Sequence, residues 1–222
     1  MSKSVYSLVL MDDVVEAVDK LAYSMNTSRS NLINQILAEA VSFTTPEKRM
    51  RDIFGQMEEL MGSLDSFQVQ NQASDAMMTF RSALRYKYKP TIRYSVELYR
   101  QAEGTMGELK VSFRTQSQQL IEDLTSFAKL WVRLENKYIG SYFPQGQILY
   151  TLENGKLIRK FLLPKEQQNC TSEQLARAIS DYIQLLDRGL KTYFAMLDTP
   201  QQAYEELEKL YSAHLRRGAT II

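Results

Sequence analysis

The chain has 222 residues, of which 44% are hydrophobic and 24% are charged, so it can form one or two folded domains. Its net charge of +1 gives no general support to nucleic-acid binding, and its single cysteine excludes a disulfide framework within one chain. No apolar run approaches the roughly 18 residues of a membrane span, and the N-terminus lacks the features of a signal peptide. We therefore expect a cytoplasmic protein with no membrane contact.

Residue types that carry most enzyme chemistry are scarce. One histidine, His214, and one cysteine, Cys170, leave no His/Cys metal cluster and no Cys–His pair, and neither GxxxxGK[ST] nor GxGxxG occurs. The sequence thus predicts no catalytic residue, metal or cofactor, and we do not expect an enzyme. His214 stands near Arg216 and Arg217, which favours a solvated helix end over a functional histidine.

Residues 5–10 (VYSLVL) are predicted to form a short strand, because they are rich in β-branched, aromatic and aliphatic side chains and stop at two aspartates. Successive side chains of a strand point to opposite faces. The alternation separates two sets of residues: Tyr6, Leu8 and Leu10 on one face, and Val5, Ser7 and Val9 on the other.

Two helices are expected after this strand. Asp12 or Asp13 offers an N-cap for the first, whose apolar residues recur at helical spacing up to Met25. Ser28 offers the N-cap of the second, which ends before Pro46. A strand and two helices within about 40 residues cannot bury their own apolar faces. This unit must therefore dimerise or pack on something else.

VYSLVL, the acidic helix after it and the segment LAYSMNTSRSNLINQIL together resemble the ribbon-helix-helix family, of the Arc and MetJ type. In that family, strands of two chains pair into an antiparallel ribbon that enters the major groove of DNA. The resemblance covers residues 1–43 and implies a DNA-binding homodimer or a higher assembly. It implies that Val5, Ser7 and Val9 face base edges, and that phosphates are met by Lys3, Ser28, Arg29 and Ser30.

The resemblance implies a bacterial-type transcriptional regulator, and an accessory DNA-binding protein of plasmid transfer or partition would have the same pattern. Family members commonly carry polar side chains on the ribbon, whereas Val5 and Val9 can make only apolar contacts, such as with thymine methyls. Residues 1–43 are also net acidic. An interaction protein that uses the module only for dimerisation is therefore a second interpretation.

Residues 45–222 are predicted to form a larger domain, behind a module at residues 1–44. Its alternating and helical patterns indicate, in chain order, helices over about 46–64 and 74–84, strands over 86–98 and 109–114, a helix over 117–138, strands over 147–152 and 157–163 around Asn154–Gly155, and helices starting near Thr171 and Pro200. The expected fold is therefore α+β and mostly helical, with a four-stranded antiparallel sheet of two hairpins and helices on one face. We expect a sensor or oligomerisation domain whose ligand or protein partner the sequence does not identify.

A basic stretch without acidic residues lies inside this domain, between residues 81 and 93: Arg81, Arg85, Lys87, Lys89 and Arg93, interleaved with tyrosines. It can serve as an additional nucleic-acid surface, in which basic side chains bind phosphates. A strand with a buried tyrosine face and a solvated basic face explains the same pattern, and this second interpretation is favoured.

Overall fold

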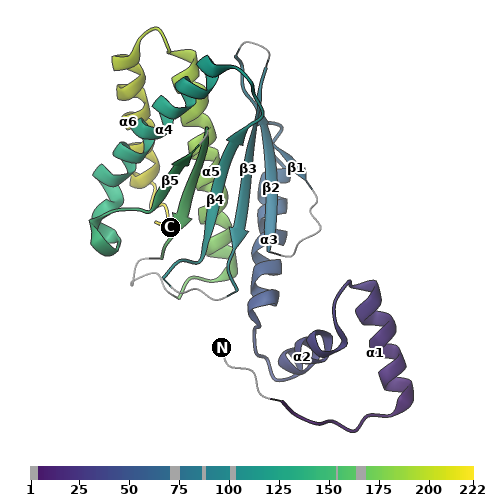
Figure 1. Ribbon diagram of the computed structural model, residues 1–222. Helices are drawn as coiled ribbons and strands as arrows, with labels where there is room; N and C mark the ends of the chain where they lie inside the picture. The colour runs from purple at the N-terminus through teal and green to yellow at the C-terminus, as the bar shows by residue number, and fades with distance from the viewer. Residues whose placement is uncertain (1–4, 71–75, 87–88, 101–103, 154, 164–168) are drawn as a thin grey trace. The chain divides into compact units, whose positions relative to one another are not determined.

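A computed structural model describes residues 5–70, 76–86, 89–100, 104–153, 155–163 and 169–222 (Figure 1). The chain divides into two compact units, residues 1–49 and residues 50–222. The fold is α+β, with six α-helices and one six-stranded antiparallel sheet among the described residues.

The N-terminal unit holds two helices, α1 (Asp12–Ser24) and α2 (Arg29–Ala40). The strand expected over residues 5–10 is not formed, because no described segment pairs with it and a strand needs a partner for its hydrogen bonds. The N-cap of α1 is Met11, so the expectation that Asp12 or Asp13 caps this helix is wrong. Both aspartates instead lie in the first turn, where negative charge is favourable next to the helix dipole.

The larger unit is built on the six-stranded sheet, in the order β1-β2-β3-β4-β6-β5 with antiparallel neighbours throughout. The strands are β1 (Gln68–Gln70), β2 (Met77–Ala83), β3 (Thr91–Leu98), β4 (Gly107–Phe113), β5 (Tyr150–Glu153) and β6 (Lys156–Phe161). The helices are α3 (Pro46–Gly62), which begins in the first unit, α4 (Gln118–Ile139), α5 (Ser172–Ala195) and α6 (Pro200–Arg216). Two short 3-10 turns, Gly140–Tyr142 and Pro144–Gly146, follow α4.

Helix starts follow local capping chemistry. The Ser117 hydroxyl accepts a hydrogen bond from the backbone N–H of Leu120 at the start of α4. Thr171 and Gln174 form a reciprocal capping box at the start of α5. Pro200 occupies the first position of α6, where its missing N–H costs nothing. These positions confirm the predicted starts of the three helices.

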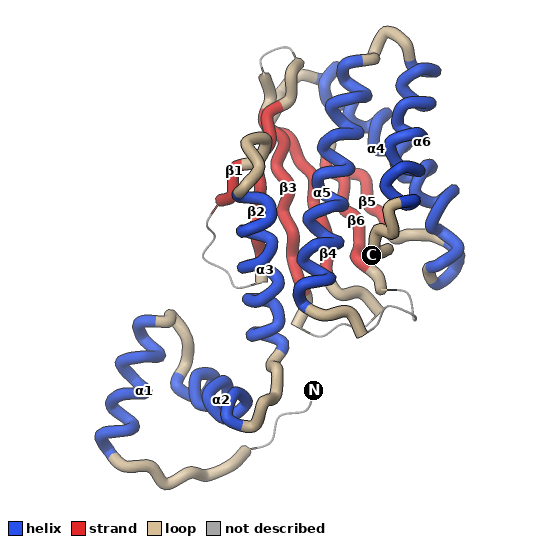
Figure 2. Tube along the Cα trace, turned by 180° about the vertical axis from the view of Figure 1, so that it is seen from behind, coloured by secondary structure: helices blue, strands red, loops and turns tan. Residues whose placement is uncertain are grey.

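One face of the sheet is covered by helices. The register aligns Phe80, Tyr94, Val111 and Leu157 across four strands, and all four side chains are buried. They belong to one continuous core with residues of α3, α4, α5 and α6. Figure 1 views the sheet from its other face, and Figure 2 shows α3 and α5 crossing in front of it from behind.

Three expectations for this unit are wrong. The sheet has six strands instead of four, because β1 and β2 extend it beyond β3. β2 occupies much of the segment predicted to be the helix 74–84; pairing with β3 outweighs its weak local helical preference. β3 begins at Thr91, not at residue 86, because the chain has first to turn back from β2: the Leu84 N–H donates to the Pro90 carbonyl, and Lys89 has a positive φ of 44°.

Gly189 in α5 lies directly against the indole ring of Trp131 in α4. A Cβ at position 189 would come 2.5 Å from Trp131 Cζ3. We expect Gly189→Ala to destabilise the protein by about 1–3 kcal/mol, since overpacking outweighs the roughly 1 kcal/mol that alanine gains over glycine in a helix.

Gly55→Ala in α3 is the matched control. A Cβ at position 55 meets nothing within 4 Å, so this substitution should stabilise the protein by about 0.5–1 kcal/mol. Urea denaturation followed by circular dichroism compares the two variants. A Gly189→Ala protein as stable as the wild type would contradict the close contact with Trp131.

Candidate nucleic-acid interface

Residues 5–11 have no regular secondary structure and are solvent-exposed, and the exposure of their side chains varies along the segment. Val5 and Val9 are 99% and 102% exposed, whereas Leu8 and Leu10 are 57% and 41% exposed. Ser7, the polar residue between the two valines, is also exposed. Leu8 and Leu10 are therefore the more shielded residues of the segment, whereas Tyr6, expected on the same face, is 84% exposed, and the Val5–Ser7–Val9 side is open to solvent.

The start of α2 presents backbone donors to solvent. The Ser28 hydroxyl accepts a hydrogen bond from the Asn31 N–H at 3.2 Å, which confirms Ser28 as the N-cap. The first bond of the helix ladder joins Leu32 N to Ser28 O. The N–H groups of Arg29 and Ser30 precede that bond, so the helix itself gives them no acceptor. Exposed N–H groups of this kind are suited to binding an anion.

Arg29 does not extend freely into solvent. Its Nε and Nη2 atoms both donate to the carboxylate of Asp19 in α1, a bidentate pair in which both side chains remain about half exposed. The sequence did not reveal this pairing, because the two residues are on different helices. Lys3, the other basic residue expected near phosphates, lies outside the described residues.

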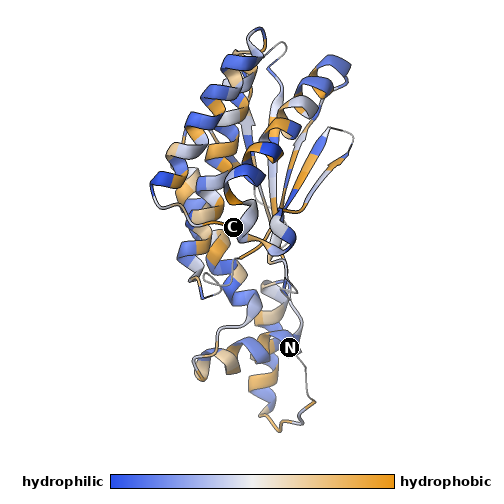
Figure 3. Ribbon diagram, turned by 90° about the vertical axis from the view of Figure 1, so that its left-hand side faces the viewer, coloured by the Kyte–Doolittle hydropathy of each residue, from blue (hydrophilic) through white to orange (hydrophobic). Residues whose placement is uncertain are grey.

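Apolar side chains are concentrated on the surface of residues 5–43. Among the described residues, nearly all large exposed hydrophobic side chains lie in this segment; the two exceptions are Tyr142 and Leu149. Only Ala22, Leu32 and Ala38 are buried hydrophobic residues of α1 and α2. Figure 3 shows orange, hydrophobic residues on these helices and on the segment before α1. This unit has far too little core to be stable by its own packing.

The basic stretch of the larger unit is divided between a turn and a strand. Arg85 and Lys89 are exposed in the connection between β2 and β3, and Lys87 lies outside the described residues. Arg93 is exposed on β3 while the neighbouring Tyr94 is buried, as the strand interpretation predicts. Arg93 shares the face of the sheet opposite the core with four further basic residues, Arg81, Lys110, Lys156 and Lys160, and with three acidic residues, Glu97, Glu108 and Glu153.

A buried ion pair joins α4 to β6 in the larger unit. Arg159 Nη2 lies 3.2 Å from Glu135 Oε1, and the two side chains are 2% and 0% exposed. The hydroxyls of Tyr150 and Tyr182 also donate to Glu135, the latter at 2.8 Å. The indole N–H of Trp131 donates to the Tyr182 hydroxyl at 3.2 Å. The network therefore ties together two helices and the β5–β6 hairpin through one carboxylate.

Burial and charge act on this network in opposite ways. Burial by itself would lower the pKa of Arg159, but the carboxylate of Glu135 and the nearby tyrosines raise it, and the net pKa is raised. Burial also raises the pKa of Tyr182, and the Glu135 carboxylate raises it further. The adjoining cavity is only about 20 Å³, room for about one water. The network is suited to holding the elements together and has no room for a substrate.

Among the described residues, no group of three or more His, Cys, Asp or Glu side chains is placed to hold a metal ion. No helix in the described part of the chain has the length and apolar character needed to cross a bilayer. Comparison with protein-family models, with curated proteins and with solved structures finds no match to this chain.

Proposed function

We propose that the chain is a DNA-binding homodimer, a regulator of transcription whose N-terminal residues 5–10 pair with those of a second copy and enter the major groove. The proposal rests on the apolar surface of residues 5–43. Soluble proteins rarely leave so much apolar surface exposed on so small a unit unless it is an interface.

A second copy of the same segment is the occupant that fits this surface best. Residues 5–10 have no regular secondary structure and lack a strand partner among the described residues, so their backbone N–H and C=O groups are open to pairing. An antiparallel pair of identical strands obeys two-fold symmetry, the commonest symmetry of homo-oligomers. Pairing would turn Leu8 and Leu10 toward the apolar residues of α1 and α2, and would leave Val5, Ser7 and Val9 outside.

The outer side of that ribbon supports a particular mode of DNA recognition. Val5 and Val9 would contact thymine methyls and Ser7 would supply the hydrogen bond, so readout should favour A·T steps. The free N–H groups of Arg29 and Ser30, together with the Ser28 cap, are suited to hold a phosphate at the start of α2. The basic residues Arg85, Lys89 and Arg93 would add positive charge.

Dimerisation without DNA binding is the second candidate function, and the Arg29–Asp19 pair favours it. Arg29 must leave the Asp19 carboxylate, or share it, before it can contact a phosphate. If the Arg29–Asp19 ion pair instead only stabilises the packing of α1 on α2, the module serves only to bring two copies together.

Competition titrations on specific and scrambled duplexes, at several salt concentrations, separate the two functions. If Arg29 binds phosphate, Arg29→Ala should weaken binding on every sequence about equally. It should also flatten the slope of log K against log salt by about 2, near 1 for each subunit. Asp19→Asn, which releases Arg29, should strengthen binding on every sequence.

Ser7→Ala and Val9→Ala test the ribbon itself. Each should change the preference among sites, because a side chain that reads a base well contributes about 1–3 kcal/mol of discrimination. If both variants keep the wild-type affinity and preference while Arg29→Ala keeps the wild-type salt slope, DNA binding by this module is excluded and dimerisation alone remains.

A further inference from the structure

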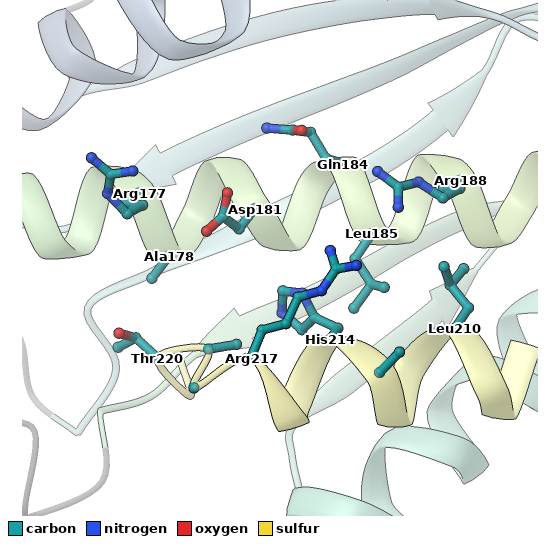
Figure 4. A pocket seen from close by; sticks show the side chains of 13 residues that line it. Arg177, Ala178, Asp181, Gln184, Leu185, Arg188, Leu210, His214, Arg217 and Thr220 are labelled. Carbon is teal, nitrogen blue, oxygen red and sulfur yellow. The ribbon is translucent and has the colours of Figure 1, made fainter.

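A cavity that is partly open to solvent lies in the larger unit, between α5, α6 and the residues that follow α6. Its volume is about 340 Å³, within the range of small-ligand pockets. α5 contributes Arg177, Asp181, Gln184 and Arg188, which recur at helical spacing along one side of the helix. Figure 4 shows His214 and Arg217 facing this row from the end of α6.

Positive charge exceeds negative charge around the cavity. Three arginines line it, Arg177, Arg188 and Arg217, against one acidic residue, Asp181. Within the described residues, neither Arg188 nor Arg217 has a salt-bridge partner, and Asp181 forms no salt bridge either. Arg177 has one, Glu173, at 3.7 Å on an exposed surface. Guanidinium groups that line one cavity repel one another, and a bound anion would relieve that repulsion.

The expected solvated helix end holds for Arg216 and Arg217, which are exposed, whereas the His214 side chain is half-buried at this cavity. Burial lowers its pKa, Asp181 acts to raise it, and Arg217 and Arg188 lower it further. The charged groups that act on the imidazole are the same ones that line the cavity: Asp181, Arg188 and Arg217.

The remaining residues that line the cavity restrict the chemical class of ligand that it can bind. Leu185 and Leu210 give the cavity an apolar part, together with three alanines. Apart from the His214 imidazole, no aromatic ring lines it, so it lacks a platform on which a nucleobase could stack. The guanidinium group of arginine can donate two hydrogen bonds to the oxygens of one anion, which suits planar carboxylates and tetrahedral phosphates.

We infer that this cavity binds a small aliphatic dianion, carrying carboxylate or phosphate groups, through Arg177, Arg188 and Arg217. The site lies wholly within the larger unit, and the inference does not depend on DNA binding by residues 5–43. It identifies the larger unit as the ligand-binding part of the protein.

Isothermal titration of the full chain in a phosphate-free buffer tests the site with three probes: inorganic phosphate, glycerol 3-phosphate and succinate. Acetate at matched ionic strength is the monovalent control. We expect saturable binding of at least one probe and none of acetate. Stronger binding of glycerol 3-phosphate assigns a phosphate ligand, and stronger binding of succinate assigns a carboxylate ligand.

Variants then assign the binding to the cavity. Arg188→Gln and Arg217→Gln should each weaken it about tenfold or more, since each removes a charge-assisted hydrogen bond. Arg216→Gln is the matched control, because Arg216 is exposed, does not line the cavity and donates to Ser212. It should bind like the wild type.

Three results would overturn the inference. The first is that no probe binds saturably. The second is that a double Arg188→Gln, Arg217→Gln variant binds as tightly as the wild type. The third is that the double variant loses affinity for DNA while the wild type binds none of the probes, which would make these arginines contacts to a nucleic-acid backbone.

Discussion

Arg159→Met should destabilise the larger unit by about 3–5 kcal/mol, because it leaves the Glu135 carboxylate buried without a counter-charge. The loss of a cation costs more here than at the surface, since Glu135 is fully buried and cannot recover hydration. The fluorescence of Trp131, the only tryptophan, measures the effect in a urea titration, because its indole is hydrogen-bonded to Tyr182 in the same network.

A second substitution separates the charge from the packing. Glu135→Gln in the Arg159→Met background removes the uncompensated charge but keeps a carbonyl oxygen that Tyr150 and Tyr182 can donate to. The double variant should therefore recover a large part of the lost stability. Non-additivity of this kind is expected for residues in one network.

Lys137→Met is the surface control. Lys137 pairs with Glu208 across α4 and α6, but its side chain is 54% exposed, so its loss should have far less effect. An Arg159→Met protein that unfolds like Lys137→Met would show that the Glu135–Arg159 pair is not held away from water.

If residues 5–10 form the proposed intersubunit ribbon, Leu8→Glu should abolish the dimer, whereas Val9→Glu should leave the dimer intact and abolish DNA binding. The two positions are neighbours and receive the same charge, but they occupy opposite sides of the segment, with Leu8 57% and Val9 102% exposed. In the paired ribbon, a glutamate at position 8 would be buried against α1 and α2, which is strongly unfavourable. A glutamate at position 9 would remain in solvent and face the negative charge of the DNA.

Sedimentation velocity at micromolar concentration gives the oligomeric state of each variant, and the duplex titrations give the affinity. Loss of DNA binding by Leu8→Glu is expected only as a consequence of dissociation. Two results would contradict the ribbon: a dimeric Leu8→Glu protein, or a monomeric Val9→Glu protein.

Local signals in the sequence were sufficient to predict most helices of the larger unit. Ser117 and Thr171 form the caps at which α4 and α5 begin. The Asn154–Gly155 signal predicted the β5–β6 hairpin, and Gly155 has the positive φ of 70° that such turns require. These features depend on neighbouring residues, so a single sequence contains them.

Features that depend on distant residues were missed. The local sequence of β2 was predicted to be helical. In the structure its core-facing residues recur at every second position, the period of a strand, and pairing with β3 determines the conformation: Met78, Phe80, Ser82 and Leu84. Arg159 alternates with Leu157 and Phe161 on the core-facing side of β6. This alternation in the sequence indicated a buried charge. Its partner, Glu135, could not be identified without the fold.

The cavity between α5 and α6 also combines a feature that the sequence predicts with one that only the fold reveals. The spacing of Arg177, Asp181, Gln184 and Arg188 places them on one side of a predicted helix, so the row itself could be seen. That the end of α6 completes the row with Arg217 follows only from the packing of the two helices.

The unpaired segment before α1 also bears on aggregation. Residues 5–11 carry no charge, proline or glycine, which is the composition of segments that stack into fibrils. Parallel, in-register stacking would place Asp12 and Asp13 of each copy about 4.8 Å from those of the next, at a steep electrostatic cost. Antiparallel pairing of two copies keeps the acidic pairs at opposite ends. In the proposed dimer, the two aspartates would thus act as gatekeepers that favour a closed pair over an open fibre.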